Sequence, residues 1–86
     1  MLDNIFETIV VGSNTEFLDI PEKDFFLNYD KVDEESAQDL ADKYFAMREK
    51  EGIPHAKDIK MDNSTHRVKI TVEVHKNRKE KSENFL

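Results

Sequence analysis

The alternation of hydrophobic and polar positions is clearest near the C-terminal end of the chain. Between residues 66 and 75, four aliphatic residues alternate with polar ones, a two-residue period that places them on one face of a β-strand. These residues are Val68, Ile70, Val72 and Val74. A shorter strand is predicted at 57–61, and the turn-forming residues 62–65 connect the two strands.

Two further strands are predicted in the N-terminal part. Residues 5–11 and 15–20 are rich in β-branched and aromatic side chains, and a turn cluster that begins at Gly12 separates them. Pro21 ends the second strand, because proline cannot donate a hydrogen bond to a neighbouring strand. The next segment, 22–29, carries aromatic residues among polar ones and is expected to pack under the sheet as a loop or a short extra strand.

The segment between the two strand pairs has a helical pattern. Its apolar residues recur at spacings of three and four, which brings them onto one stripe of an α-helix. Asp30 or Asp33 is expected to cap this helix, and Gly52 with Pro54 to end it near Glu51. The positions of the predicted stripe are Ala37, Leu40, Ala41, Tyr44, Met47 and Arg48.

Together these elements predict an α+β fold with the order ββαββ, in which one helix packs on one face of an antiparallel sheet. Residues 1–75 are expected to form this single domain. Residues 76–84 are almost wholly charged or polar, so we expect a frayed, flexible C-terminal tail over residues 76–86.

The composition limits how much of the domain can be buried. Of the 86 residues, 37% are hydrophobic, against roughly 45–50% in typical domains. The core is therefore expected to be thin, and a homodimer would add buried area. The chain has no cysteine, no apolar segment long enough to cross a bilayer and no signal-peptide start, which predicts a cytoplasmic protein without membrane contact.

Charge is distributed unevenly along the chain. Residues 1–47 carry twelve acidic and three basic side chains, a net charge of −9, and residues 48–86 carry seven and ten, a net of +3, which sum to −6. The helix acids lie opposite the apolar stripe, and although a charged helix side is usually just solvated, this one continues into the preceding loop. The candidate partner-binding residues are Asp30, Asp33, Glu34, Glu35, Asp39, Asp42 and Glu49.

The residue types that carry chemistry favour binding over catalysis. His55, His66 and His75 lack the close spacings of zinc sites. With two glycines there is no glycine-rich phosphate loop, and no serine or threonine lies in a nucleophile motif. Paired acids need a cleft to act as general acid and base, and a chain this small seldom builds one. We therefore predict no enzymatic activity, no cofactor and no metal site.

A basic group of residues supports an alternative interpretation. Arg67, Lys69, Arg78 and Lys79 lie in the last predicted strand and the tail, and such clusters can bind phosphates. Acidic residues interrupt the group, and no aromatic residues are interleaved for base stacking. Direct nucleic-acid binding is therefore the second hypothesis, and a structural subunit of a larger assembly is the third.

The acidic stretch 30–35 and the helix acids after it resemble, in overall character, the small acidic proteins with which large lytic bacteriophages disable host machinery. Some of those proteins are DNA mimics that act against nucleoid proteins such as HU. The resemblance implies a non-enzymatic inhibitor in the host cytoplasm, which binds the DNA-contacting surface of a basic protein and blocks access of DNA to it. The basic C-terminal residues depart from a uniformly acidic decoy.

Overall fold

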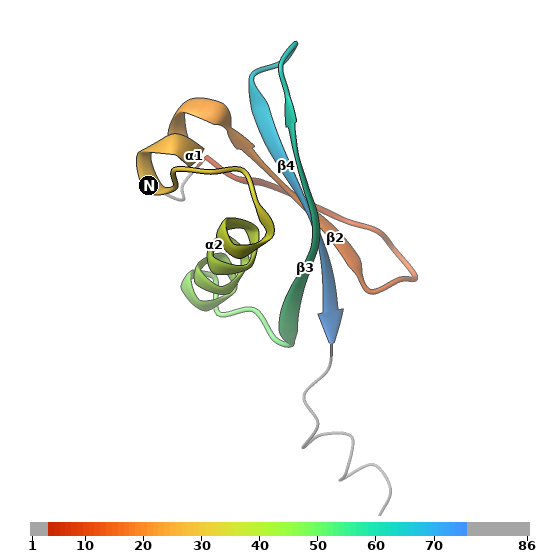
Figure 1. Ribbon diagram of the computed structural model, residues 1–86. Helices are drawn as coiled ribbons and strands as arrows, with labels where there is room; N and C mark the ends of the chain where they lie inside the picture. Colours follow the sequence, from red (N-terminus) through yellow and green to blue (C-terminus); the bar gives the residue numbers. More distant parts are fainter. Residues whose placement is uncertain (1–3, 76–86) are drawn as a thin grey trace, which may run out of the picture.

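In the computed structural model, which describes residues 4–75, two β-hairpins join through their second strands into one antiparallel sheet (Figure 1). The strand order across the sheet is β1-β2-β4-β3, so β1 and β3 lie at its two edges. The strands are β1 (Phe6–Ile9), β2 (Thr15–Pro21), β3 (Ile53–Asp62) and β4 (Arg67–His75).

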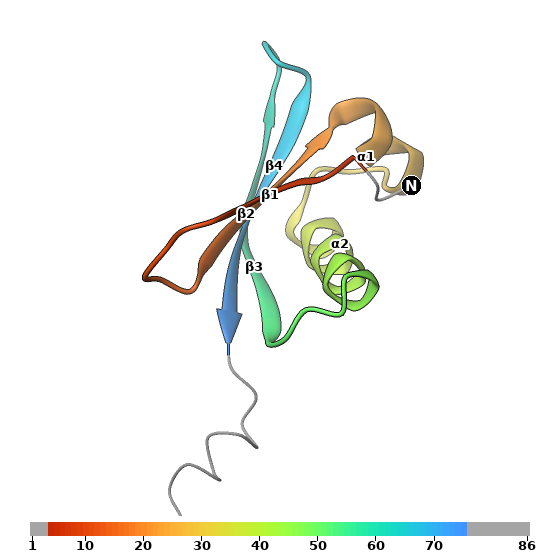
Figure 2. The same ribbon diagram turned by 180° about the vertical axis from the view of Figure 1, so that it is seen from behind.

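Two helices, not one, connect the hairpins. α1 (Glu22–Asn28) and α2 (Glu34–Met47) follow β2 in succession and lie on the same side of the sheet (Figures 1 and 2). The fold is α+β with an antiparallel sheet, as predicted, but its element order is ββααββ. The predicted order ββαββ with a single helix is wrong.

The additional helix, α1, forms where a loop or a short strand is predicted. Neighbouring residues of a helix point about 100° apart, so Phe25 is fully buried while Phe26 remains exposed. Pro21, with a φ of −58°, directly precedes the helix and already has the backbone angle that suits its first turn. Two acids in the first turn interact favourably with the helix dipole.

The longer helix, α2, begins at the predicted cap and ends before the predicted stop. The side chain of Asp33 accepts a 2.9 Å hydrogen bond from the backbone N–H of Ser36. The helix ends at Met47 rather than near Glu51, because Glu49 adopts a left-handed φ of 53°. The backbone N–H groups of Glu49 and of the next residue donate to carbonyls of the last turn, a Schellman motif with glutamate where glycine is usual.

The early end of α2 changes which of its residues are buried. Met47, 48% exposed, and Arg48 lie outside the core, contrary to the prediction, because they stand at the end of the helix. Phe45 is buried in their place. The other four predicted stripe positions, Ala37, Leu40, Ala41 and Tyr44, are buried as expected.

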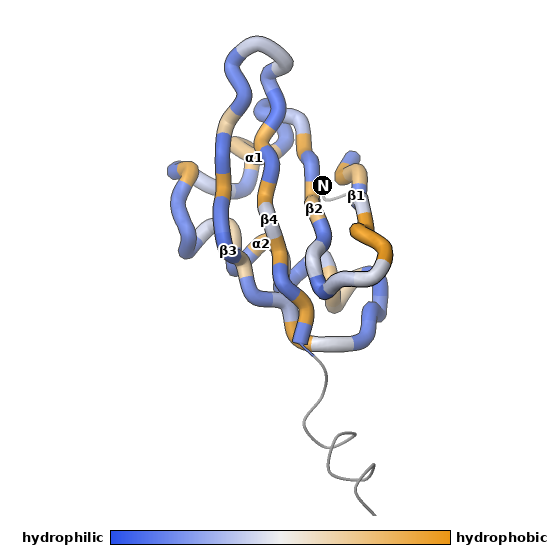
Figure 3. Tube along the Cα trace, turned by 90° about the vertical axis from the view of Figure 1, so that its right-hand side faces the viewer, coloured by the Kyte–Doolittle hydropathy of each residue, from blue (hydrophilic) through white to orange (hydrophobic). Residues whose placement is uncertain are grey.

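One layer of apolar side chains fills the space between the helices and the sheet. Alternate residues of β2 and β4 point into it, which confirms the alternation predicted for β4. The other face of the sheet is not covered by any element within residues 4–75 (Figure 3). The largest fully buried side chains are Leu18, Ile20, Phe25, Leu40, Tyr44, Val68, Ile70 and Val72.

The edge strands differ in length from the predicted ones. β1 is shorter than the predicted segment 5–11, because residues 10–13 form a turn in which Gly12 has a φ of +84°. β3 is longer than the predicted segment 57–61 and includes Pro54. A proline is tolerated there because β3 is an edge strand.

Within residues 4–75, no helix is long and apolar enough to cross a membrane. The predicted tail, 76–86, lies outside the described residues. The domain boundary after residue 75 therefore stays a prediction.

Gly52 and Gly12 provide a matched test of the packing between the connection after α2 and strand β4. Both have a positive φ, but an added Cβ would lie 2.6 Å from Cγ1 of Val74 at Gly52 and would meet no atom within 4 Å at Gly12. We expect Gly12→Ala to lower the free energy of unfolding by about 1 kcal/mol through its backbone angle alone. Gly52→Ala should cost about 2–4 kcal/mol, because the contact with Val74 adds to that angle.

Urea denaturation of the two variants measures these losses. Each variant adds the same methyl group at a positive φ, so the difference between them reports the contact with Val74. Equal losses would show that this contact does not constrain the fold.

Candidate partner-binding surfaces

The predicted acidic residues gather on the helical side of the molecule. Segment 22–49, which contains both helices, carries nine acidic and four basic side chains, a net charge of −5. Of the seven candidate residues, Asp30 precedes the cap of α2, and Glu49 follows the end of α2. Asp33 caps α2, Glu34 lies in its first turn, and Glu35, Asp39 and Asp42 lie on the side of the helix away from its buried residues.

Three of these acids make internal contacts that hold them in place. Asp33 caps α2, and Asp42 accepts a 2.9 Å hydrogen bond from Nε2 of Gln38. Asp39 accepts a 2.8 Å hydrogen bond from the hydroxyl of Tyr29 and lies 3.0 Å from Nζ of Lys43. The hydrogen bond from Tyr29, and then that from Lys43, lowers the pKa of Asp39, so this carboxylate remains ionised.

The remaining four acids, Asp30, Glu34, Glu35 and Glu49, are exposed. Within residues 4–75, Asp39 is the only candidate acid that forms an ion pair, and its partner Lys43 is itself well exposed. The structure thus brings the candidate acids together on one side, and their charge is largely uncompensated there.

The open face of the sheet differs from the helical side because its charges are mixed. Arg67 forms an ion pair with Asp19, and its guanidinium carbon lies 5.2 Å from the centre of the Phe6 ring. Lys69 is exposed, with Nζ 5.9 Å from the centre of the Phe17 ring. Viewed from this side, polar and apolar positions alternate along the strands (Figure 3).

These contacts weaken the predicted basic surface. The charge of Arg67 is already compensated by Asp19, and Lys69 is the other basic candidate within the described residues. Arg78 and Lys79 lie outside the described residues. The described part of the open face therefore offers little net positive charge for a phosphate backbone.

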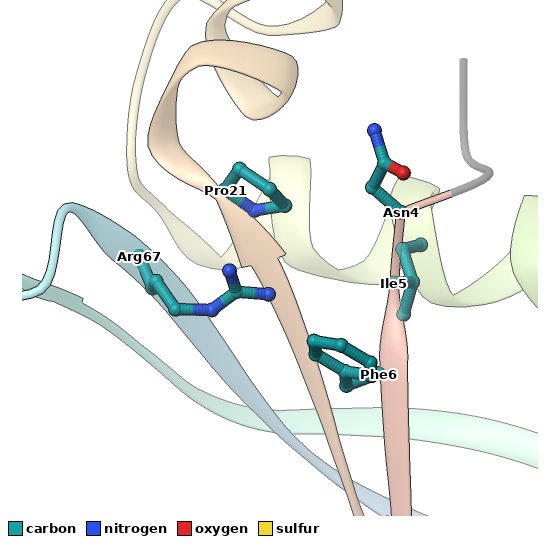
Figure 4. A pocket seen from close by; sticks show the side chains of 5 residues that line it. All are labelled: Asn4, Ile5, Phe6, Pro21 and Arg67. Carbon is teal, nitrogen blue, oxygen red and sulfur yellow. The ribbon is translucent and has the colours of Figure 1, made fainter.

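A shallow hollow of about 260 Å³ lies where β1 begins and β2 ends (Figure 4). Its lining residues are Asn4, Ile5, Phe6, Pro21 and Arg67. The walls are mostly apolar, and the guanidinium of Arg67 also donates a 3.3 Å hydrogen bond to the backbone carbonyl of Asp19. Because its one cation already has partners, the hollow is better suited to an apolar side chain than to an anion.

The histidines occupy separate places. His55 and His75 stack edge to face on β3 and β4, with ring centres 4.4 Å apart, while His66 lies 3.3 Å from Glu22. Within residues 4–75, no three His, Cys, Asp or Glu side chains are arranged to hold a metal ion. The stacked pair was not expected from the sequence, because the register of β3 against β4 was unknown.

A partly buried ionic cluster, also missed from the sequence, lies between the first hairpin and the end of α2. Lys50 contacts the carboxylate of Glu7 and lies 3.4 Å from Oε1 of Glu16. The hydroxyl of Tyr44 donates a 3.1 Å hydrogen bond to Glu7. The sequence did contain a signal, because Glu16 shares the strand parity of the buried Leu18.

The pKa values of the two carboxyl groups of the cluster are shifted in opposite directions. Burial raises the pKa of Glu16, and the adjacent Glu7 raises it further. Burial alone would also raise the pKa of Glu7, but hydrogen bonds with Glu16, Lys50 and Tyr44 outweigh it and lower the pKa. Lys50 lies between the carboxylates, so the cluster resembles a structural ion pair rather than an acid–base pair that faces a substrate.

Because of these shifts, Glu16 and Glu7 should affect stability with opposite signs. The raised pKa means that Glu16 stabilises the fold when protonated and loses this contribution as pH rises through its folded pKa. The lowered pKa means that Glu7 stabilises the fold above its ordinary pKa of 4.5 and loses this as pH falls.

We therefore expect Glu16→Gln to raise the free energy of unfolding at about pH 7 by about 1 kcal/mol, and Glu7→Gln to lower it by about 1–2 kcal/mol. Urea denaturation at about pH 7 and at about pH 4 measures both. Each difference from the wild type should shrink at the lower pH. A stabilised Glu7→Gln variant at neutral pH would contradict the assigned contacts.

No protein-family model, no curated protein and no solved structure matches this chain.

Proposed function

We propose that the protein is a non-enzymatic acidic binding protein, whose helical side occupies the DNA-binding surface of a basic protein such as the nucleoid protein HU. The observation that supports this proposal is the set of exposed carboxylates on α2 and the loop before it, of which Asp39 alone has a cationic partner within residues 4–75. The mechanism would be competition with DNA, in the host cytoplasm if the target is a nucleoid protein.

The spacing of the helix acids supports DNA mimicry in particular. Glu34, Glu35, Asp39 and Asp42 span nine residues, and the eight steps between the first and the last cover roughly 12 Å of helix axis at a rise of about 1.5 Å per residue. Four charges over that length correspond to roughly one per 3–4 Å, close to the one per about 3.4 Å of a single DNA strand. A basic groove that binds DNA would thus meet a similar density of negative charge.

The internal contacts of the acidic side favour a pre-arranged surface. The cap at Asp33 and the hydrogen bond from Tyr29 to Asp39 hold the start and the middle of α2 against the rest of the fold. Fixed carboxylates lose less entropy on binding than mobile ones. Glu49 keeps a charged side chain at a left-handed position where glycine would be less strained, which is consistent with a use for that charge.

Exposed apolar side chains near the acids could add selectivity. Phe26 and Leu27 on α1 and Met47 at the end of α2 are all exposed. Charge would steer the encounter, and apolar contacts of this kind would distinguish one basic partner from another.

The test is displacement of fluorescent duplex DNA from purified HU, followed by fluorescence anisotropy. The wild-type protein should release the DNA at low salt and lose this ability steeply as salt rises, because exposed charges are screened beyond about 8–10 Å at physiological ionic strength. The double variant Glu35→Lys with Asp42→Lys should weaken the release by at least about tenfold.

The matched control is Glu51→Lys with Asp58→Lys. Each acid-to-lysine change raises the net charge by two, so both double variants change it from −6 to −2. The two control residues lie outside the helical side, Glu51 after α2 and Asp58 on β3. Circular dichroism checks that both variants are folded. Equal loss of activity in the two variants would show that net charge matters and the helical side does not.

A second candidate function, direct nucleic-acid binding, has one observation in its favour. On the open face, Phe6 and Phe17 each lie beside a cation, Arg67 and Lys69 respectively, and aromatic rings beside cations are typical of single-strand binding surfaces. The same anisotropy experiment without HU distinguishes the two. A DNA mimic leaves free DNA unbound, whereas this alternative requires the protein to bind it.

A further inference from the structure

The two edge strands of the sheet, β3 and β1, differ in how their outer backbone groups are covered. At the β3 edge, the side chain of Gln38 donates a 2.9 Å hydrogen bond to the carbonyl of Pro54 and accepts a 2.8 Å hydrogen bond from the backbone N–H of Ala56. Pro54 has no N–H to offer, and the ladder is irregular between Ala56 and Asp58. Prolines, bulges and covering side chains are the usual means by which proteins prevent a strand edge from pairing.

The β1 edge has none of these features. Residues 6–9 contain no proline and no lysine, and within residues 4–75 no strand pairs with the outer side of β1. Its one charged side chain, Glu7, turns toward Lys50 and Tyr44 on the helical side. In Figure 2, β1 crosses the front of the molecule with no described element over it.

Backbone groups on this edge are free to pair. The N–H of Val10 donates to the carbonyl of Thr15 in β2, and donors in an antiparallel ladder alternate in direction from residue to residue. The N–H and C=O groups of Glu7 and Ile9 therefore point away from β2. Within residues 4–75 no strand bonds to these groups, so they are available to an added strand.

The side chains along the edge are also unusually apolar. Phe6 is 69% exposed, Ile9 58% and Val11 94%, and Val10 is partly exposed as well. With a buried phenylalanine worth 150–250 Å² and aliphatic residues somewhat less, these exposed parts amount to roughly 400 Å² per chain. Two chains that cover them would bury about 800 Å², below the roughly 1,000 Å² of most specific interfaces, so the association should be weak and should depend on the backbone hydrogen bonds between the strands as well.

We propose that a second copy of this chain pairs with β1, so that two sheets join into one antiparallel sheet of eight strands. The strand is self-complementary when Thr8 lies on the two-fold axis. Glu7 then exchanges backbone hydrogen bonds with Ile9 of the other copy, and Phe6 packs beside Val10 of the other copy. This register keeps the two Glu7 side chains from facing each other.

Charge favours a second copy at this edge over a strongly charged partner. Glu7 is compensated by Lys50, and Asp19 on the neighbouring strand is compensated by Arg67. Most of the net negative charge of the chain is carried by segment 22–49, and none of the acids of that segment lies on β1 or β2. Two copies can therefore meet at β1 without bringing uncompensated carboxylates together.

The test is sedimentation velocity of Ile9→Lys beside its matched control, Ile53→Lys. Ile9 and Ile53 are 58% and 50% exposed and lie on opposite edge strands, so both changes place a lysine at an exposed edge isoleucine. At high micromolar concentration the wild type and Ile53→Lys should sediment as dimers of about 20 kDa, twice the chain mass of 10.1 kDa. Ile9→Lys should sediment as a monomer.

Amide hydrogen exchange gives a second readout that does not depend on a variant. In the wild-type dimer the N–H groups of Glu7 and Ile9 should be protected, and dilution should remove this protection while the N–H of Thr8, bonded to β2, stays protected. A monomeric wild type at high concentration, unprotected Glu7 and Ile9 in a dimer, or dissociation by Ile53→Lys instead of Ile9→Lys would each overturn the proposal.

Discussion

The fold depends on a single layer of apolar side chains between α2 and the two central strands. Leu18 on β2 and Ile70 on β4 are paired in register and fully buried, and Leu40 and Tyr44 of α2 are fully buried in the same layer. Because strand side chains alternate, burial of these residues also determines which residues face away from the helices. A shift of one residue in the pairing register of β4 would turn its aliphatic residues outward and bring Lys69 and Glu73 into the core.

The same layer explains how the two sides of the molecule came to carry different charges. On the sheet, acids and bases face each other across strands, as Arg67 does with Asp19 and Lys57 with Glu73 at 3.5 Å. On α2 the apolar stripe uses the positions that face the sheet, so the acids collect on the remaining side, where Lys43 is the one cation within residues 4–75 that forms an ion pair with them. The acidic side is thus a product of helix geometry together with a biased composition, and it does not depend on a cleft.

Sequence patterns predicted the parts of this structure in which one period dominates. The alternation in β4 and the spacing of Leu40 and Tyr44 led to the correct elements. Burial of one face of a strand or helix requires apolar residues at regular intervals in the sequence. The pattern failed for Phe25 and Phe26, since a run of adjacent aromatic residues suits a short helix as well as a strand. It also failed at the end of α2, because Glu49 adopts a left-handed φ that is usually found at a glycine after a helix.

The predicted acids were found together because they belong to one helix and the loop before it, whose geometry is local. The cluster of Glu7, Glu16, Tyr44 and Lys50 was not found because its members come from three distant segments, and only the register of the first hairpin brings them together. Local periodicity carries no information about such contacts. The sequence does show that Glu16 alternates with the buried residues of β2. This alternation predicts that Glu16 is buried, but it does not identify the residues that Glu16 contacts.

Gln38 also determines how the β3 edge of the sheet can be approached. Its side chain satisfies backbone groups of β3 at Pro54 and Ala56, so an added strand cannot bond to these groups. In the proposed dimer the β1 edges are used in one symmetric contact, and β3 is the edge at which Gln38 hinders further pairing. One glutamine on α2 thus makes the two edges of this sheet unequal as sites for an added strand.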